Sequence, residues 1–362
     1  MSTQLSTNGG KADQPGGGQY FNLASKTNKV TGVIMKIYYD SDASIKHIQG
    51  QKIAVIGYGS QGRAQALNLR DSGLDVVIGN IKDSYWDLAV EDGFSPVDIA
   101  VAAMEANIIL FLIPDQAQKK VFTELIEPNL KPDDLLIFAH GFSINYKKIL
   151  PIEDIDVCLL APRMPGIPIR EHYLKGHGVP AFVDVHQDAS SHAWDRLLGL
   201  AKAIGFTRVG VMEVSFQEET ELDLFIEQYF LPMFMGTIQA SFDVLVEEGY
   251  SPMPALMELY ASGELGELML LSADMGIYKV WVEQASPTCQ YGIFRASTRI
   301  LDKEKMRSVI KTVIQEVREG TFLPELDQEA DAGYVNLKAY DKANDESLLM
   351  QTQRDLKKAL KI

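Results

Sequence analysis

Short apolar segments that alternate with stretches of helical periodicity constrain the fold of this chain more than any other feature. They run from about residue 36 to residue 213 and are short enough for buried strands. Strands that alternate with helices in this way predict parallel βαβ units. We therefore expect an α/β fold with a Rossmann-type, doubly wound sheet. The expected strands are 52–57, 74–79, 107–113, 135–139, 157–160, 181–185 and 207–212, and the expected helices are 61–72, 97–105, 116–126 and 190–204.

The pattern changes after residue 214, which divides the chain into domains. From about 216 to 322 the strand signal is weak and helix-compatible stretches dominate, most clearly at 216–231, 234–248 and 302–319. This predicts a Rossmann-type domain at 35–214 and an all-helical domain at 215–334. We expect a flexible extension rich in Gly, Ser, Thr and Gln at 1–34, and a polar, peripheral tail at 335–362.

Composition argues against several classes of protein. The 362 residues include 49 Asp and Glu against 34 Lys and Arg, and the net charge of −15 argues against a nucleic-acid partner. The two cysteines, Cys158 and Cys289, are too few for a disulfide framework or a zinc quartet, which favours a cytoplasmic location. The sequence offers no run of ~18 uninterrupted apolar residues, so we expect no membrane span.

A glycine-rich loop follows the first apolar segment and opens the first helical one. Its sequence is Gly57-Tyr58-Gly59-Ser60-Gln61-Gly62. Between a strand and a helix, such glycines permit a tight turn, the approach of a pyrophosphate and close helix–strand packing. The free N–H groups and the dipole at the helix start favour the anion. We interpret the loop as a dinucleotide-binding site; the alternative is a glycine-rich turn without a ligand.

The end of the second strand bears on which dinucleotide binds. An NAD site usually places an acid there, on the ribose 2′-hydroxyl. No acid stands at Gly79 or Asn80, whereas Lys82 and Ser84 could hold the 2′-phosphate of NADPH. Asp83 leaves NADH possible, and a solvated loop lysine is the alternative for Lys82. We favour NADPH.

Acidic residues are concentrated between 218 and 227, within a stretch of helical character. Asp223 and Glu227 are four residues apart and share a helix face, with Leu224, Phe225 and Ile226 between them. Two carboxylates on one face of a partly buried helix suit Mg²⁺, which prefers oxygen ligands and retains waters. The alternative is a solvated acidic face without a metal.

Several motifs, taken together and in order, resemble one enzyme family. They are Lys36-Ile-Tyr-Tyr-Asp40, Val55-Ile-Gly-Tyr-Gly-Ser-Gln-Gly62, Ala66-Leu-Asn-Leu-Arg-Asp-Ser-Gly73, Leu112-Ile-Pro-Asp115, Phe138-Ala-His-Gly-Phe142, Glu218-Glu-Thr-Glu-Leu-Asp-Leu-Phe225 and Glu227-Gln228. As a set they resemble ketol-acid reductoisomerase, the acetohydroxyacid isomeroreductase, in its short form. The resemblance extends from about residue 36 to residue 322.

The resemblance implies a Rossmann domain, a knotted all-α domain that intertwines in a homodimer or larger homo-oligomer, NADPH and two Mg²⁺ ions. Knots are rare exceptions among protein folds. Family enzymes convert 2-acetolactate or 2-aceto-2-hydroxybutyrate into 2,3-dihydroxy acids in branched-chain amino-acid biosynthesis. An alkyl group migrates and hydride then reduces the new ketone, while two metals grip the alkoxide and carbonyl oxygens side by side.

The resemblance also implies roles for particular residues. Asp223 would bridge the two metals and Glu227 would bind one of them. Glu258 aligns with the first member of a second acidic pair, which the partner subunit supplies. His140 would lie near the substrate at the carboxyl edge of the sheet, where ligands bind in such folds; a structural loop histidine is the alternative. Ser286 matches the substrate-contacting serine, or is a helix cap before a proline.

Two remaining positions of the family pattern concern the cofactor. Pro114 and Asp115 close the Leu-Ile-Pro-Asp motif after a predicted strand. We assign both to the cofactor site together with the glycine loop, Lys82 and Ser84.

The chain departs from the family pattern at the chemistry. Where the family has Lys-Gly-Pro-Gly, this chain has Arg163-Met-Pro-Gly166, and Arg63 replaces a histidine after the glycine loop. Arginine holds charge but does not readily relay protons. The position four residues after Glu258 is Ser262, although Glu264 and Glu267 follow. A lost carboxylate would weaken the second metal and thereby the alkyl migration more than the hydride transfer.

Three hypotheses follow. The first is an NADPH- and Mg²⁺-dependent ketol-acid reductoisomerase in which His140 and Arg163 are catalytic. The second is a divergent member that reduces a related keto acid in a specialised pathway without alkyl migration. The third is a non-catalytic nucleotide-binding relative. The intact pair of Asp223 and Glu227 favours an enzyme that acts on a small keto or hydroxy acid.

Overall fold

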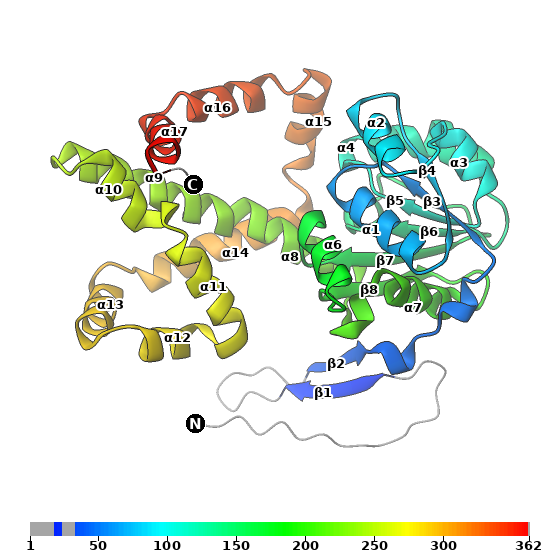
Figure 1. The fold of residues 1–362 in the computed structure, drawn as a ribbon, viewed down its shortest axis with the longest axis horizontal. Coiled ribbons are helices and arrows are strands. Elements are labelled where there is room, and N and C mark those ends of the chain that lie inside the picture. The colour runs from blue at the N-terminus through cyan, green and yellow to red at the C-terminus, as the bar shows by residue number, and fades with distance from the viewer. Residues whose placement is uncertain (1–17, 24–32, 361–362) are drawn as a thin grey trace. The chain divides into compact units, whose positions relative to one another are not determined.

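The computed structural model describes residues 18–23 and 33–360, which form two compact units that divide between Thr220 and Glu221 (Figure 1). The division falls inside a helix, α8 (Phe216–Phe225), a few residues after the expected boundary at 214. Residues 1–17 and 24–32, most of the expected N-terminal extension, and 361–362 lie outside the described residues.

The first unit is built on a nine-stranded sheet with the order β1-β2-β9-β8-β7-β6-β5-β3-β4. From β4 to β7 neighbouring strands are parallel, as the alternating pattern predicts. After β3 the chain forms β4 as its neighbour on one side, and then returns to form β5 as its neighbour on the other side. The direction in which strands are added to the sheet therefore reverses beside β3. The strands are β1 (Gln19–Leu23), β2 (Val33–Tyr38), β3 (Lys52–Ile56), β4 (Asp75–Gly79), β5 (Ile108–Phe111), β6 (Leu135–Phe138), β7 (Asp156–Pro162), β8 (Ala181–Gln187) and β9 (Val211–Glu213).

Two features of the sheet differ from the sequence expectation. Strand β8 runs antiparallel to β7, so the sheet is mixed, although helix α6 (Gly166–Leu174) lies between the two strands in the chain. Strands β1 and β2 form an antiparallel pair, and β2 pairs with β9. The segment Gln19–Leu23 is therefore a strand, and the expectation of a flexible extension is wrong for it.

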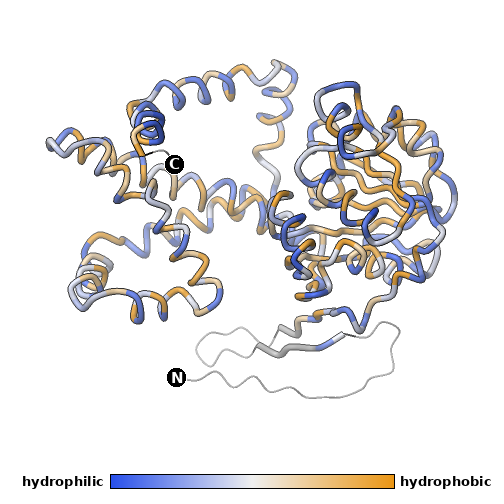
Figure 2. The backbone as a smooth tube through the Cα atoms, in the orientation of Figure 1, coloured by the Kyte–Doolittle hydropathy of each residue, from blue (hydrophilic) through white to orange (hydrophobic). Residues whose placement is uncertain are grey.

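Helices cover both faces of the sheet, because each strand directs alternate side chains to opposite faces. On β3, Ile53 and Val55 join the core under α1 and α7, whereas Ala54 and Ile56 join the core under α3. Figure 2 shows these strands as hydrophobic tracks inside the first unit. The helices of this unit are α1 (Ser60–Asp71), α2 (Ser84–Glu91), α3 (Ile99–Glu105), α4 (Asp115–Val121), α5 (Phe142–Asn145), α6 (Gly166–Leu174) and α7 (Ala193–Ile204).

The second unit is helical throughout its described residues. Its core combines Phe242 of α9 with Leu256 of α10 and with Leu349 and Leu356 of α17. The tail beyond residue 335 is therefore not peripheral, since its last helix supplies two of these core side chains. The helices are α9 (Leu231–Glu247), α10 (Pro252–Leu256), α11 (Glu264–Met275), α12 (Ile277–Gln284), α13 (Pro287–Arg299), α14 (Lys303–Glu319), α15 (Leu323–Asp331), α16 (Val335–Asp345) and α17 (Leu348–Leu360).

A buried arginine joins the amino ends of four strands. The Arg196 guanidinium, on α7, donates to Asp156 Oδ2 at 2.9 Å and to the Asp133 carbonyl at 2.8 Å. It also donates to Gln51 Oε1 at 2.9 Å and to the Asn107 carbonyl at 3.1 Å. Because Arg196 is only 6% exposed and Asp156 is fully buried, this network stabilises the edge of the sheet opposite the glycine loop.

Replacing Arg196 with methionine should destabilise the first unit, because the Asp156 carboxylate would remain buried without its cation. The expected loss is about 3–5 kcal/mol of unfolding free energy, measured by denaturant unfolding. Lys52→Met is the matched control, because Lys52 pairs with Glu105 at the surface, with side chains 36% and 41% exposed. It should cost no more than about 1 kcal/mol. Equal losses in the two variants would contradict a structural role for Arg196.

Candidate active site

The glycine loop has the geometry that a dinucleotide needs. Gly57 has a φ of 92°, which favours glycine, and a Cβ on Gly62 would lie 1.9 Å from the Gly57 carbonyl oxygen. Gly59 differs, because a Cβ there would meet no protein atom within 4 Å. The space above Gly59, at the start of α1, is thus open for an anion that the helix N-terminus favours. The observed loop fits the pyrophosphate of a dinucleotide.

A cavity of about 690 Å³ lies over this loop, at the carboxyl ends of β3, β5 and β6. It stands where the strand order reverses, which is where ligands bind in open α/β sheets. Gly57 and Gln61 line one side, and Pro114, Asp115 and His140 line another. The structure therefore brings together these predicted cofactor and catalytic residues.

The predicted 2′-phosphate residues lie at the start of α2. Asp83 caps this helix, since its carboxylate accepts from the backbone N–H groups of Tyr85 and Trp86 at 2.9 and 3.1 Å. Lys82 is exposed, with its ammonium 5.7 Å from the centre of the Trp86 ring, and Ser84 is the first residue of the helix. Asp83, the acid that could bind a ribose hydroxyl, is therefore used as a helix cap. Lys82 beside it is accessible to a ligand.

Tyr58 is the glycine-loop residue whose side chain points away from the cofactor space. Its ring is fully buried, and its hydroxyl donates to Asp92 Oδ2 at 2.9 Å. Arg63 binds the same carboxylate through two hydrogen bonds of 2.6 and 2.9 Å and holds the pKa of Asp92 below its usual value. Only the backbone of Tyr58 remains to contact a cofactor, and Arg63 joins α1 to the end of α2.

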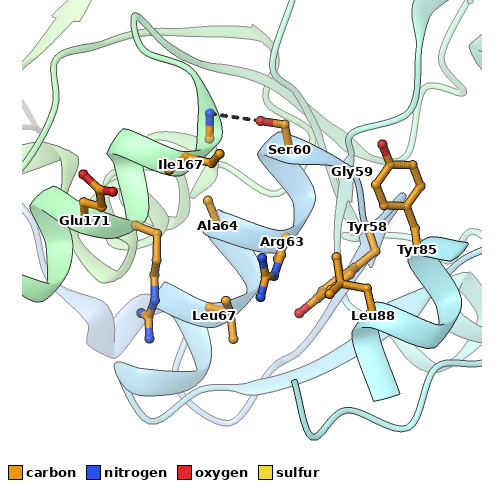
Figure 3. Close-up of a pocket in the computed structure, with 12 residues that line it drawn as sticks. Tyr58, Gly59, Ser60, Arg63, Ala64, Leu67, Tyr85, Leu88, Ile167 and Glu171 are labelled. Atoms are coloured by element: carbon orange, nitrogen blue, oxygen red, sulfur yellow. Dashed lines mark hydrogen bonds between the residues drawn. The ribbon is translucent and has the colours of Figure 1, made fainter. Parts of the chain in front are cut away.

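The loop that carries Arg163 packs on the start of α1. Gly166 N–H donates to Ser60 Oγ at 3.2 Å (Figure 3), and Gln61 Nε2 donates to the Met164 carbonyl at 2.9 Å. Between α1, α2 and α6 this packing leaves a second cavity of about 450 Å³, which shares Tyr58 and Ser60 with the first. The side chains of Ser60 and Gln61 thus position the loop that carries Arg163. What these two residues can offer a cofactor is therefore their backbone N–H groups.

His140 follows β6 and is held by a side chain at the start of α4, the helix after the neighbouring strand β5. Its Nδ1 lies 3.0 Å from Oδ2 of Asp115, the first residue of α4 after β5. The two side chains are 19% and 28% exposed, so each is partly accessible from the cavity. Asp115, predicted to bind the cofactor, is therefore also a partner of His140.

A buried carboxylate links the His140 loop to Arg163. Glu219 on α8 is fully buried, and it accepts from the Gly141 N–H at 2.8 Å and from Arg163 Nη2 at 2.9 Å. The Arg163 guanidinium also lies 4.9 Å from the centre of the Phe182 ring, a cation–π contact. Arg163 is thus fixed on both sides, which suits a stationary positive charge and not a mobile proton relay.

The first turn of α8 is anchored in the first unit. Phe216 packs against Phe138 and His186, and its N–H donates to Asp184 Oδ2 at 2.9 Å. Burial raises the pKa of Asp184. A Cβ on Gly141 would lie 2.6 Å from the Phe216 carbonyl oxygen, so glycine is required where the loop meets the helix.

The acids of α8 continue from this anchor. The donor atoms of His140 and Glu219 lie within 4.8 Å of each other. Asp223 follows Glu219 by four residues, about one turn of α8. Glu227 is exposed and lies beyond α8, in a π-helical turn at Ile226–Phe230. The predicted regular helix through Asp223 and Glu227 therefore widens between them, and π-helical turns of this kind often occur at functional sites.

Two further predicted residues, Glu258 and Ser286, lie in the second unit. Glu258 is exposed and lies in another π-helical turn, Met257–Ala261. Ser286 caps α13 by accepting from the Cys289 N–H at 3.3 Å, which is the alternative that the sequence left open. Neither belongs to the group of converging donor atoms at His140 and Glu219.

Sequence reasoning missed Glu219 and the link between Asp115 and His140. A signal for Glu219 was present, because Phe216, Thr220 and Leu224 mark a buried face of α8 and Glu219 lies on it. An acid on a buried face requires partners. The link from Asp115 to His140 had no sequence signal, because it depends on β5 and β6 being neighbours.

Comparisons with known proteins agree with this geometry. Residues 47–210 match the family model "acetohydroxy acid isomeroreductase, NADPH-binding domain", and residues 216–362 match "ketol-acid reductoisomerase, C-terminal domain". A ketol-acid reductoisomerase (NADP(+)) of Caldivirga maquilingensis is 45% identical over 83% of this chain and 91% of its own length. A ketol-acid reductoisomerase (NAD(P)(+)) of Metallosphaera sedula is 41% identical over 90% and 97%.

A solved structure gives the same assignment. An NADH-preferring ketol-acid reductoisomerase from an uncultured archaeon superposes with a TM-score of 0.85 and 35% identity, over 90% of this chain and 99% of its own. The resemblance noted from the motifs is thereby confirmed, as is the combination of a Rossmann-like domain and a helical domain. This chain belongs to the ketol-acid reductoisomerase family and is an NADP-dependent oxidoreductase of that family.

Proposed function

We propose that this enzyme converts a 2-acetohydroxy acid of the acetolactate type into a 2,3-dihydroxy acid, with NADPH as hydride donor and Mg²⁺ as the metal, in branched-chain amino-acid biosynthesis. One observation supports this most strongly. The cofactor cavity ends at His140, whose neighbour Glu219 lies one turn before Asp223. Under this proposal, the hydride donor lies in the cavity that His140 lines, and the carboxylates are supplied by the helix α8.

The cofactor would be held by the glycine loop, with its pyrophosphate over Gly59. Lys82, and Ser84 at the start of α2, would hold the 2′-phosphate, since the carboxylate of Asp83 is engaged as a helix cap. Pro114 would line the same cavity beyond β5. An exposed lysine beside a helix N-terminus suits a phosphate, which supports NADPH over NADH.

The donor set fits a hard cation. Asp223 and Glu227 offer carboxylate oxygens, which Mg²⁺ prefers, and the exposure of Glu227 leaves room for waters. Glu219 is engaged with Gly141 and Arg163, and an imidazole is a poor ligand for Mg²⁺, so His140 would serve the substrate instead. When bound, the metal would supply charge stabilisation for the two reacting oxygens. Glu258 of a second copy would complete the site, and Ser286 would contact the substrate.

The chain's own residues would orient the substrate and exclude water. His140 would exchange a proton with a substrate oxygen at the cofactor cavity. Arg163 stays protonated, so it would hold negative charge beside that oxygen without relaying a proton. The second candidate function, reduction without alkyl migration, is supported by this same arginine and by Ser262, which replaces an acid.

We also propose a homodimer or larger homo-oligomer as the working assembly. The helical stretch Phe216–Glu247 is long and apolar enough to cross a membrane by length and composition, and about half of its large apolar side chains are exposed. It also carries Glu219, Asp223 and Glu227, and acids of this kind are costly inside a bilayer. A second copy is therefore the better cover for the exposed Phe230 and Phe234. The free cysteines fit a reducing cytoplasm.

The full reaction is tested with two substrates. NADPH oxidation is followed with 2-acetolactate and, separately, with the already rearranged 3-hydroxy-2-keto acid. Turnover of both is expected. Turnover of the rearranged acid alone would show that only the reductase half operates. Turnover of neither, with cofactor binding retained, would point to the nucleotide-binding relative.

Gly59→Ala tests the cofactor cradle. The added methyl meets no protein atom, so the melting temperature should stay unchanged, but it occupies the space proposed for the pyrophosphate. The dissociation constant for NADPH, measured by fluorescence titration, should rise about 10-fold or more, equivalent to about 1.4 kcal/mol. Unchanged affinity would show that the dinucleotide lies elsewhere.

Asp223→Asn tests the metal site. Loss of one carboxylate should remove Mg²⁺ binding in calorimetry and lower turnover by about 100-fold or more, with NADPH affinity unchanged. Glu218→Gln, a change to an exposed acid in the first turn of the same helix, is the matched control and should leave both values near those of the parent. Equal loss of NADPH and Mg²⁺ binding in Asp223→Asn would show that the residue is structural.

A further inference from the structure

The geometry points to Asp115 as a positioning residue that sets the tautomer and orientation of His140; this inference rests on the proposed role of His140 at the substrate. The Asp115 carboxylate lies 3.0 Å from His140 Nδ1. Both residues line the cofactor cavity, at the ends of the neighbouring strands β5 and β6. The sequence places Asp115 at the cofactor, and the contact with His140 gives it a second role that acts through the imidazole.

The contact has a defined chemical consequence. A carboxylate only accepts hydrogen bonds when ionised, so Nδ1 of His140 must carry the proton that lies between the two groups. The neutral ring then has an unprotonated Nε2, which can accept a proton or a hydrogen bond. Asp115 therefore sets which nitrogen of His140 is turned toward the carboxylate and which is offered to a ligand.

The surroundings hold the other parts of this arrangement in place. Asp115 is the first residue of α4, where the helix dipole favours an ionised carboxylate. On the opposite side, Gly141 N–H is bound to the buried Glu219, and the Phe142 ring centre lies 6.0 Å from that of His140. The backbone of His140 is thus fixed independently of Asp115. Asp115 contributes the contact at Nδ1, which orients the ring.

The same geometry argues against a direct role of Asp115 in binding the cofactor. The carboxylate would repel the phosphates that the glycine loop attracts, and it is already engaged with an imidazole. A residue that acts through His140 should affect turnover, whereas a residue that binds the cofactor should affect affinity. The two roles therefore predict different measurements.

The test compares Asp115→Asn, His140→Ala and the double variant in the full-length enzyme with NADPH, Mg²⁺ and the rearranged 3-hydroxy-2-keto acid. Asp115→Asn should lower kcat by about 10- to 100-fold, the range for residues that orient a functional histidine. KM and the dissociation constant for NADPH should stay within about twofold of the parent. Asp87→Asn, which removes an exposed acid from the first turn of α2, is the matched control and should leave kcat unchanged.

The double variant separates the inference from the proposed function. If Asp115 acts only through His140, Asp115→Asn should cause no further loss of kcat in the His140→Ala background. Additive losses, or a raised dissociation constant for NADPH in Asp115→Asn, would overturn the positioning role. An unchanged kcat in His140→Ala would instead show that the proposed role of His140 is wrong, whatever Asp115 does.

Discussion

The site depends on one buried carboxylate. Glu219 is fully enclosed, and an ionised carboxylate in such a place is costly unless it is paired and hydrogen-bonded. Its partners are a backbone N–H beside His140 and the guanidinium of Arg163, which belong to loops after different strands. Since each partner satisfies the same charge, the two loops and the start of α8 are constrained together. Asp223 follows about one turn later in the same helix.

This constraint also changes what an arginine does in place of the family's lysine. A lysine ammonium in an apolar site can shift its pKa and exchange a proton, whereas arginine stays charged. Here the guanidinium is held by Glu219 on one side and by the Phe182 ring on another. Under the proposed function, this exchange would replace a mobile proton donor by a fixed charge. Proton transfer would then fall to His140, which lines the cavity.

The sequence predicted the parts of the fold that depend on local patterns, and it failed where distant segments determine the result. The apolar segment and glycine loop at 52–62 became β3 and the start of α1, because both signals are local. The antiparallel direction of β8 and the pairing of β2 with β9 could not be predicted, since they depend on tertiary neighbours. For the same reason Leu349 and Leu356 looked like parts of a polar tail, although they pack in a core with Phe242.

The site shows the same division. The roles assigned to Asp223, Glu227 and Ser286 came from motif positions and stay predictions, whereas the network around Glu219 is visible only in three dimensions. The spacing of residues in the sequence predicts which side chains share a helix face. It does not predict which loop packs against that face. The contact between Asp115 and His140 is of this second kind.

The π-helical turns at Ile226–Phe230 and Met257–Ala261 have a consequence for insertions and deletions. A π turn holds about one residue more than a turn of α-helix. Removing one residue from Ile226–Phe230 would let a regular helix continue with the later side chains of α9 at nearly the same angle to Asp223, because the residue lost is the extra one that the π turn holds. Each π turn therefore absorbs one residue without changing the phase of the helix that follows, so homologous chains should tolerate a one-residue gap there more readily than elsewhere in the same helices.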